Sequence, residues 1–226
     1  MGITLTEQVY DRIKRDIMLH NLVPGQKLNY KTLSESYGIS ETPIKQALHR
    51  MVADGIVLSE PNRGMWIKKY GRCEIEDIID TRLMFESYNV DCIYSAINGN
   101  MRIRKRIQDN LQRHAEIAEH YDPENIQHYI DAMEIDDAFH KQLMYCTGNQ
   151  TMVDLYTRLK AFVFAFHTFG LQSKERIQRN VTEHTRIYDG LISDDVENAR
   201  KAIISHNRSS KQNTVMMFKM DDDMEY

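Results

Sequence analysis

The sequence predicts a mostly α-helical protein made of two parts. Apolar residues recur every three or four positions through most of the 226 residues, which is the periodicity of helices packed against a core. Glycine and proline, the residues least compatible with helix interiors, number only ten and four. One short stretch, residues 56–67, instead has two apolar runs around a turn sequence, which indicates a single hairpin. We expect one domain in residues 1–70 and a second in residues 71–226.

Composition argues against a membrane protein or a secreted protein and is consistent with nucleic-acid binding. No run approaches the roughly 18 consecutive apolar residues of a membrane span, and the N-terminus lacks the apolar core of a signal peptide. The three cysteines are odd in number and lack Cys-x-x-Cys spacing, which is typical of the reducing cytoplasm. Residues 1–70 carry ten Lys or Arg against seven Asp or Glu, whereas residues 71–226 carry nineteen against twenty-six. A basic first part on an acidic body is consistent with nucleic-acid binding by the first part.

The first forty residues predict two helices with a break between them. An apolar stripe runs through residues 6–20, and Asn21-Leu22-Val23-Pro24-Gly25 then interrupts the helix. Asn29 is a suitable N-cap for a short second helix that ends at Tyr37. Gly38 permits the tight turn that follows.

A third helix and a hairpin complete the first part. Ser40 is expected to cap this helix, Pro43 is tolerated in its first turn, and Gly55 ends it. Its apolar stripe consists of Ile44, Ala47, Leu48 and Met51. Two short strands are expected at residues 56–58 and 65–67. This order of elements predicts a winged helix-turn-helix.

The polar face of the third helix is the expected DNA-reading surface. The side chains that face away from its apolar stripe are Glu41, Thr42, Lys45, Gln46 and His49. In a helix-turn-helix this face enters the major groove, where the base edges carry the full donor and acceptor pattern. Double-stranded DNA is therefore the expected partner.

The motifs of this first part have a family likeness. They are Gly25-Gln26-Lys27-Leu28, Tyr37-Gly38-Ile39-Ser40, Thr42-Pro43-Ile44-Lys45-Gln46-Ala47-Leu48, Gly55 and Gly64. In this order and spacing they resemble the GntR family of bacterial regulators over about residues 6–69. The resemblance implies that Lys31, Ser40, Thr42 and Lys45 touch phosphates or bases. It also implies that the wing tip, Arg63-Gly64, approaches the minor groove.

Two positions depart from the family pattern, because Glu41 and Lys45 stand where the family usually places guanine-reading arginines. Lys45 can still donate to guanine, although less rigidly than a guanidinium fork. Glu41 cannot donate, so it favours a cytosine amino group or acts only as a negative charge at the helix N-terminus. We expect an operator that differs from the family's usual sequence.

The second part predicts an antiparallel α-helical bundle. The expected helices are residues 74–98, 101–120, 126–146, 150–169, 173–192 and 194–219. Short loops join them, and the core of such a bundle is a natural place for a ligand or a metal ion. We expect the linker near Tyr70-Gly71-Arg72 to act as the hinge between the two parts.

Four residues of the bundle predict a metal site. Asp136 and His140 lie four positions apart on one helix face, and His184 and His206 lie on two later helices. One carboxylate and three imidazoles suit zinc, with nickel or manganese as alternatives. Asp137 is the alternative carboxylate, three residues before His140. The remaining histidines have no comparable spacing and are expected to pack or to face solvent: His114, His120, His128 and His167.

The bundle also has a family likeness. Its motifs are Arg82-Leu83-Met84-Phe85-Glu86, residues 136–140, Gly148-Asn149, Glu183-His184 and Ala202-Ile203-Ile204-Ser205-His206. They resemble the FCD domain, the ligand-binding domain of the FadR subfamily, over about residues 74–215. The resemblance implies that Asp136, His140, His184 and His206 hold a divalent metal ion. It also implies a pocket at the metal for a small carboxylate effector.

Two further residues are candidates for effector binding. The guanidinium of Arg82 matches a carboxylate with two parallel hydrogen bonds, and Asn149 can add another. The alternative for Arg82 is an ion pair with Glu86, four residues later on the same helix. The function expected is a homodimeric repressor that binds a pseudo-palindromic operator and responds to a small carboxylate. A regulator that senses the ion itself and a metalloenzyme remain the alternatives.

Overall fold

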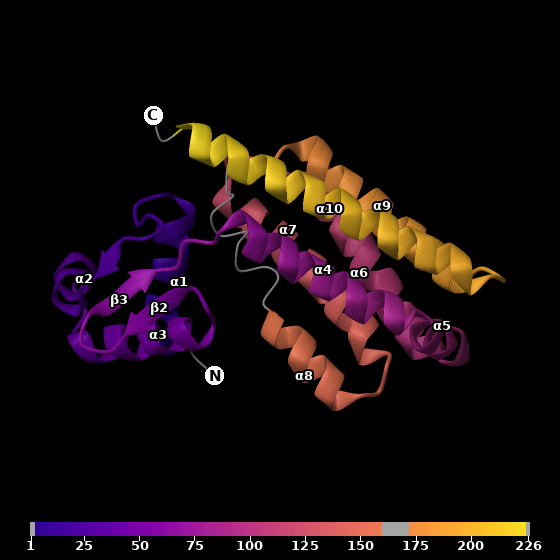
Figure 1. Ribbon diagram of the computed structural model, residues 1–226, viewed down its shortest axis with the longest axis horizontal. Coiled ribbons are helices and arrows are strands. Elements are labelled where there is room, and N and C mark those ends of the chain that lie inside the picture. Colours follow the sequence, from indigo (N-terminus) through magenta and orange to yellow (C-terminus); the bar gives the residue numbers. More distant parts are fainter. Residues whose placement is uncertain (1–2, 160–171, 225–226) are drawn as a thin grey trace. The chain divides into compact units, whose positions relative to one another are not determined.

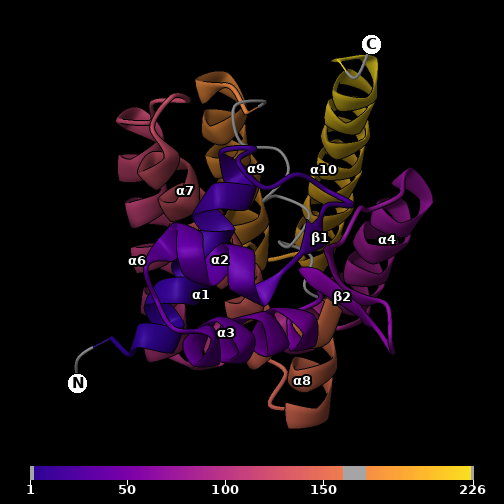
Figure 2. The same ribbon diagram turned by 90° about the vertical axis from the view of Figure 1, so that its left-hand side faces the viewer.

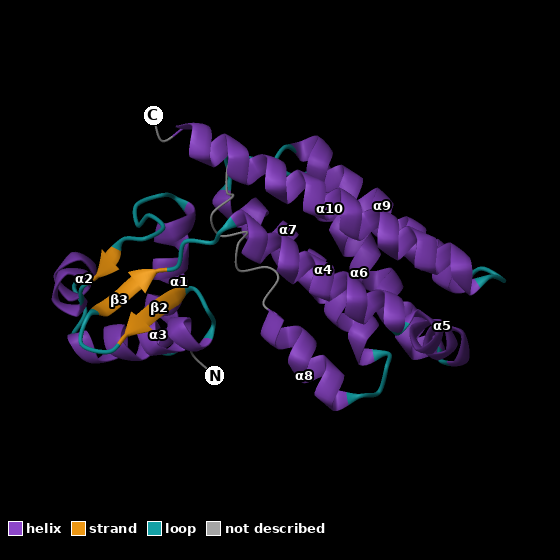
Figure 3. Cartoon of the chain, viewed as in Figure 1, coloured by secondary structure: helices purple, strands orange, loops and turns teal. Residues whose placement is uncertain are grey.

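The computed structural model describes residues 3–159 and 172–224, with side chains as far as residue 216. Within these ranges the chain forms ten helices and one three-stranded sheet, which confirms the mostly α prediction (Figures 1 and 3). One compact unit ends at Tyr70 and a second begins at Gly71. None of the described helices is both long enough and apolar enough to cross a membrane.

The first unit contains three helices and the sheet. Its elements are α1 (Leu5–Met18), β1 (Lys27–Leu28), α2 (Tyr30–Tyr37), α3 (Glu41–Ala53), β2 (Val57–Glu60) and β3 (Gly64–Ile67). Helices α1 and α2 both pack on α3, and the sheet lies beside them (Figure 2). The predicted apolar stripes are buried: Val9, Ile13, Ile17, Ile44, Leu48 and Met51 are all inaccessible. The predicted winged helix-turn-helix is confirmed.

The turn between α2 and α3 follows from local hydrogen bonding. The side-chain oxygen of Asn29 accepts from the backbone amides of Lys31 at 2.8 Å and Thr32 at 3.3 Å, so the predicted N-cap is confirmed. Gly38 ends α2 with φ of 67°, a left-handed conformation that glycine adopts without a side-chain clash. This turn sets the direction in which α3 leaves.

The predicted cap of α3 needs a correction. Ser40 occupies the N-cap position, but its side chain makes no capping hydrogen bond. A capping side chain normally accepts from the second or third amide of the helix, and here the third residue is Pro43, which has no N–H. The exposed Ser40 hydroxyl therefore makes no capping hydrogen bond. It lies at the helix N-terminus, where the helix dipole favours anions.

The sheet is antiparallel with strand order β1-β3-β2. The hairpin pairs Val57 with Ile67 and Glu60 with Gly64, so β2 extends two residues beyond the predicted strand. Gly64 has φ of 117°, which supports the tight wing turn. Strand β1 was not predicted, because two residues are too few to show an alternating pattern.

The second unit is a bundle. Its helices are α4 (Arg72–Tyr88), α5 (Val90–Gly99), α6 (Met101–Glu119), α7 (Ile126–Tyr145), α8 (Gln150–Leu159), α9 (Lys174–Ile192) and α10 (Val196–Met224). The prediction of one helix over residues 74–98 is wrong, since α4 ends and α5 begins at Asn89. The side-chain amide of Asn89 donates to the carbonyl of Phe85 at 2.7 Å and competes with the helical pattern. The end of the predicted helix 150–169 lies outside the described residues.

One apolar cluster joins α5, α6, α7, α9 and α10, with Phe139, Leu143, Ile187, Leu191 and Ile203 at its centre. Helices α9 and α10 approach closely at Gly190, where an added Cβ would lie 2.5 Å from the backbone nitrogen of Ala199. The two helices run side by side in Figure 1. This close packing brings together the histidines that the two helices carry.

Candidate metal centre and DNA-facing surface

Three histidines from three helices direct one ring nitrogen each to the same place. His140 lies on α7, His184 on α9 and His206 on α10, and all three side chains are buried. Nε2 of His140 lies 3.1 Å from Nε2 of His184 and 3.2 Å from Nε2 of His206. The fold thus assembles three of the four predicted ligands from distant parts of the sequence.

These separations fit coordination of one ion. With metal–nitrogen bonds of about 2.0–2.1 Å, two ligand nitrogens lie about 3.0 Å apart at a right angle and about 3.4 Å apart at a tetrahedral angle. The two distances from His140 fall between these values. Nε2 of His140 is therefore spaced from the other two nitrogens as two ligands of one ion would be, and the three ligand atoms all lie within 4.8 Å of one another.

Asp136 lies beside this cluster, one helical turn before His140. Its Oδ1 is 3.4 Å from Nε2 of His184. Burial alone would raise the pKa of Asp136, but the opposing effect of His140 and Arg82 outweighs it, and the pKa is lowered. The alternative carboxylate, Asp137, is instead paired with Lys141 at 2.5 Å. The structure therefore places an ionised Asp136 at the edge of the cluster.

A carboxylate lies beside the Nδ1 atom of two of the imidazoles. Oε1 of Glu86 lies 2.9 Å from Nδ1 of His140, and Oε2 of Glu183 lies 2.8 Å from Nδ1 of His206. A carboxylate at Nδ1 favours the tautomer with its proton on that nitrogen, which leaves a lone pair on Nε2. The Glu183 contact is a hydrogen bond and makes Nε2 of His206 an acceptor, whereas Nδ1 of His140 lies near Glu86 without a hydrogen bond of good geometry.

The third imidazole is held by packing. The ring of His184 stacks on Phe139 at 4.1 Å between centroids, and its Nδ1 has no hydrogen-bond partner among the described residues. Burial and the neighbouring His206 and His140 hold the pKa of His184 well below its usual value. Burial likewise lowers the pKa of His206. Neutral imidazoles are the form that binds metal ions.

Arg82 reaches the cluster from α4. Its Nη2 contacts Nε2 of His140 and lies 3.3 Å from Nε2 of His206. Its Nε donates to Glu86 at 2.9 Å, so the ion pair offered as the alternative role of Arg82 is present in the structure. The Glu86 pair uses Nε, and the contacts with His140 and His206 use Nη2, so one guanidinium makes both sets of contacts. A guanidinium group therefore borders the space into which the three lone pairs point.

Glu86 is the centre of a buried network that sequence reasoning did not identify as functional. Its side chain is inaccessible, and it accepts from Tyr156 at 2.6 Å and from Asn207 at 2.9 Å in addition to Arg82. Burial opposes its ionisation, but His140 and Arg82 hold its pKa well below the usual value. A signal was available: Glu86 lies seven residues after the apolar Ile79, on the same face of the helix, and one turn from Arg82.

Glu183 and Arg176 form a second buried pair beside the centre. Their side chains lie 3.4 Å apart, and Ser209 donates to Glu183 at 2.7 Å. Glu183 was noted only as part of a family motif next to His184. Its orienting contact with His206 depends on the packing of α9 against α10, which no local pattern reveals.

The remaining histidines differ from one another. His114 on α6 is buried, and its ring centroid lies 5.3 Å from that of His184, so it is part of the surroundings of the centre. Burial lowers the pKa of His114. His120 is exposed, and His128 accepts from the backbone of Asp122 at 3.2 Å. His167 lies outside the described residues. The position of His114 on the apolar face of α6 was the available signal.

Asn149, which was predicted to hydrogen-bond the effector, lies in a turn at the surface. It lies in the exposed turn after α7, and its side-chain oxygen accepts from the backbone amide of Met152 at 3.1 Å. This is a capping contact at the start of α8. The structure therefore gives Asn149 a local structural role and shows no contact with the described residues of the centre.

On the first unit, the predicted DNA-facing side chains of α3 are all exposed. Lys45 is paired with Glu41 at 2.8 Å, and its Nζ lies 5.3 Å from the ring of Tyr30. Gln46 accepts from the hydroxyl of Thr6 at 2.8 Å. Thr42 is exposed in the first turn, beside the Ser40 hydroxyl. Part of the positive charge of this surface is thus neutralised within α3 itself.

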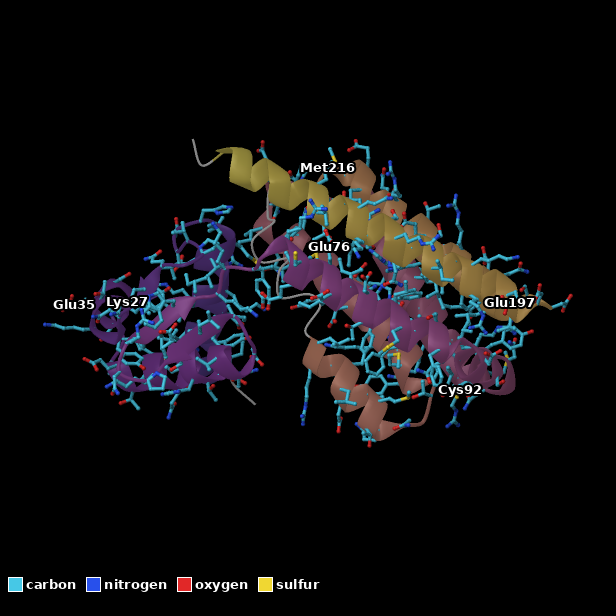
Figure 4. The ribbon with its side chains drawn as sticks, viewed as in Figure 1. Lys27, Glu35, Glu76, Cys92, Glu197 and Met216 are labelled. Carbon is cyan, nitrogen blue, oxygen red and sulfur yellow. The ribbon has the colours of Figure 1, made fainter. Side chains whose placement is uncertain are left out.

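The other predicted contacts also lie at the surface. Lys31 on α2 is exposed, with Glu35 at 3.9 Å; Figure 4 shows Glu35 at the edge of this unit. Arg63 at the wing tip pairs with Glu60 at 2.6 Å, next to Gly64. These ion pairs are solvent-exposed, and such pairs contribute little to stability and can exchange for phosphate contacts.

Comparison with known proteins identifies the family of each of the two units. Residues 5–67 match the family described as "Bacterial regulatory proteins, gntR family", and residues 77–209 match the FCD domain. The chain is 24% identical over 211 residues to an uncharacterized HTH-type transcriptional regulator in an unstable DNA locus of Streptomyces ambofaciens, which covers 92% of this chain and 84% of that protein. It is 21% identical over 205 residues to the HTH-type transcriptional repressor RspR of Escherichia coli, which covers 89% of this chain and 85% of that protein. The structure of E. coli McbR/YncC has the same fold, with a TM-score of 0.69 and 18% identity over 97% of this chain and 99% of that one.

Proposed function

Because this chain belongs to the GntR family of bacterial regulatory proteins and carries an FCD domain, we propose that it is a repressor controlled by a small carboxylate. The carboxylate would bind at a divalent metal ion held by Asp136, His140, His184 and His206. The family and its relatives are transcriptional regulators and not enzymes. A regulator of this kind acts on chromosomal DNA, in the bacterial cytoplasm.

The observation that carries the proposal is the convergence of three imidazole Nε2 atoms, two of which have a carboxylate within 2.9 Å of the opposite ring nitrogen. Lone pairs that face one another repel unless a cation lies between them. Zinc is the expected ion, with nickel or manganese as alternatives, because imidazole and carboxylate ligands suit all three. The bound ion would supply an electrophilic centre for an anionic ligand.

The charges of the buried groups support a carboxylate with a single negative charge. Arg82 and Arg176 offset Glu86 and Glu183, which leaves the negative charge of Asp136. A divalent ion would make the net charge +1 when the imidazoles are neutral, and one carboxylate would cancel it. Arg82 is positioned to pair with that carboxylate, because its Nη2 already points into the centre.

DNA recognition is assigned to the first unit. We propose that Glu41, Thr42, Lys45 and Gln46 of α3 face the major groove. Lys31 and Ser40 would contact phosphates, and the wing tip at Arg63-Gly64 would approach the minor groove. A homodimer would present two such surfaces to a pseudo-palindromic operator. Binding of the effector would change operator affinity by about 5–150-fold, which requires roughly 1–3 kcal/mol of coupling.

The test is a metal analysis of the purified protein combined with thermal melts against a panel of small mono- and dicarboxylates. A ligand that binds the folded state raises the Tm by mass action. We expect near-stoichiometric metal and a Tm increase with at least one monocarboxylate, both lost in D136A and H140A. H120A, at an exposed histidine, is the matched control and should keep both. Metal-free protein from metal-supplemented cells, with no response to any acid, would overturn the proposal.

A regulator in which the ion itself is the signal is the second candidate. It is favoured by the contact of Arg82 with His140 and His206, because an ion bound by those nitrogens must share them with or displace the guanidinium. Operator binding measured at buffered metal concentrations, without any acid, separates the two candidates. An ion-dependent change in operator affinity supports the metal sensor, and its absence supports the carboxylate sensor.

A further inference from the structure

His114 on α6 is a buried polar side chain for which the structure shows no hydrogen bond. Its exposed fraction is 1%, and neither of its ring nitrogens has a hydrogen-bond partner among the described residues. A buried polar group without a partner destabilises the fold, so native structures rarely keep one without another reason. Its ring contacts that of His184, at 5.3 Å between centroids, although its nitrogens are not part of the converging group.

Unpaired polar atoms continue from this point along one face of α9. Arg176, Asn180 and His184 are spaced four residues apart, which places them in a row on the helix. Nε of Arg176, Oδ1 of Asn180 and Nδ1 of His184 are all buried and have no hydrogen-bond partner among the described residues. Arg176 also donates to Ser209 and Ser210 of α10, and His114 joins the row from α6 through its contact with His184. We call His114, Arg176, Asn180 and His184 the polar strip.

We propose that His114 is a specificity-determining residue that hydrogen-bonds an uncharged polar group, such as a hydroxyl, on the carboxylate effector. This inference rests on the proposed function, because it takes the carboxylate end of the effector to lie at the metal centre beside Arg82. It adds that the effector extends from there along the polar strip toward α6.

The chemistry of the strip favours a hydroxyl over a second carboxylate. A neutral imidazole offers one donor and one acceptor, and a hydroxyl group offers the complementary pair. Asp136 exerts its negative charge on His114, so a second carboxylate beside His114 would be repelled. Asn180 and Arg176 can extend the same pattern to a further hydroxyl.

The experiment compares matched pairs of acids on the metal-loaded full-length protein. Acetate is paired with glycolate, and propionate with lactate, so that each pair differs by one hydroxyl group. In the wild type we expect the hydroxy acid of each pair to bind on the order of tenfold more tightly, as measured by calorimetry. H114L should remove this preference and bring both members of a pair to similar affinity. H114Q, which retains a donor and an acceptor, should recover part of it.

The control is N110A, one turn earlier on the same face of α6. The amide nitrogen of Asn110 donates to the carbonyl of Ile135 at 3.2 Å and ties α6 to α7, whereas its Oδ1 has no partner among the described residues, so N110A disturbs the packing of α6 without changing His114. N110A should lower the Tm and leave the preference for hydroxy acids unchanged. H114L should leave the Tm of the ligand-free protein unchanged or raise it by roughly 2–4 °C, because it removes an unpaired buried polar group.

The outcomes separate the two levels of the proposal. If neither member of any pair binds the wild type, whereas metal is retained, the carboxylate-sensor function itself fails. If both members bind the wild type equally, or H114L and H114Q keep the full wild-type preference, only the role of His114 is overturned. Loss of the preference in N110A as well as H114L would also overturn it, because a general effect of α6 packing would then explain the result.

Discussion

Glu86 on α4 lies 2.9 Å from Nδ1 of His140 on α7, and this contact joins two residues that are 54 positions apart in the sequence. Glu86 also holds Arg82, Tyr156 and Asn207. One buried carboxylate therefore orients both a candidate metal ligand and the guanidinium that faces the same centre. Such outer residues tune metal affinity without touching the ion.

Substitution of Glu86 should weaken metal binding. E86Q removes the negative charge beside His140, and we expect a 10–100-fold loss of affinity, measured by competition with a chelator of known affinity. E76Q is the matched control, because Glu76 is on the same helix in an outer pair with Arg72. An E86Q variant that binds the ion as tightly as wild type would show that the contact has no influence on the site.

Stability without metal should fall on acidification. The pKa values of His184 and His206 are lowered in the folded protein, so below about pH 6.5 the unfolded chain binds more protons than the folded one. The free energy of unfolding must then decrease as the pH falls. Glu86 and Asp136, whose pKa values are also lowered, add a further loss below about pH 4.5. Thermal melts in chelator from pH 8 to pH 4 test this, and a constant Tm between pH 7.5 and pH 5.5 would contradict it.

Glu41 should restrain DNA binding through its pair with Lys45 at 2.8 Å. E41Q should free the ammonium group for phosphate or guanine and tighten binding to operator DNA on the order of fivefold at low salt. K45A should weaken binding and reduce the salt dependence by about one counterion. K105A, at an exposed lysine of the second unit, is the control. Weaker binding by E41Q would instead indicate that Glu41 itself reads a base.

Close packing at Gly190 should be essential for the centre. G190A places a Cβ 2.5 Å from the nitrogen of Ala199, so α9 and α10 must separate, and we expect a loss of about 3 kcal/mol in stability. His184 and His206 lie on these two helices, so metal affinity should fall as well. G99A is the control, because nothing lies within 4 Å of the added Cβ. Denaturant unfolding measures the stability of both variants, and chelator competition measures their metal affinity. Equal stability and equal metal affinity in G190A and G99A would refute the argument.

Local patterns predicted most of the fold. The apolar stripes of α1 and α3, the Asn29 cap and the Gly38 turn were all readable, because each depends on residues within one or two helical turns. The predictions that failed also have local causes, within one or two helical turns. Proline at the third position of α3 removes one of the two amides that could bond to Ser40, and the side chain of Asn89 adds a hydrogen bond to the carbonyl of Phe85 at the point where a predicted helix divides.

The candidate centre was predicted only in part. Asp136 and His140 were readable as a pair because helix periodicity fixes their common face. Glu86, Glu183 and His114 were not assigned to the centre, because their positions there depend on helices that come from distant segments. Asn149 was assigned on a motif alone, and the structure shows it capping α8.

The sequence by itself determined the helical periodicity, the winged helix-turn-helix and the Asp136/His140 pair, since these follow from local spacing and residue chemistry. The choice of His184 and His206 rested on their residue type and on the motifs around them. The tertiary structure decided which nitrogen of each imidazole faces the centre, and which carboxylates and guanidinium groups surround it. The reason is that hydrogen-bond direction and desolvation depend on distances between helices. Those distances are set by the packing of whole helices, as at Gly190, and no local pattern encodes them.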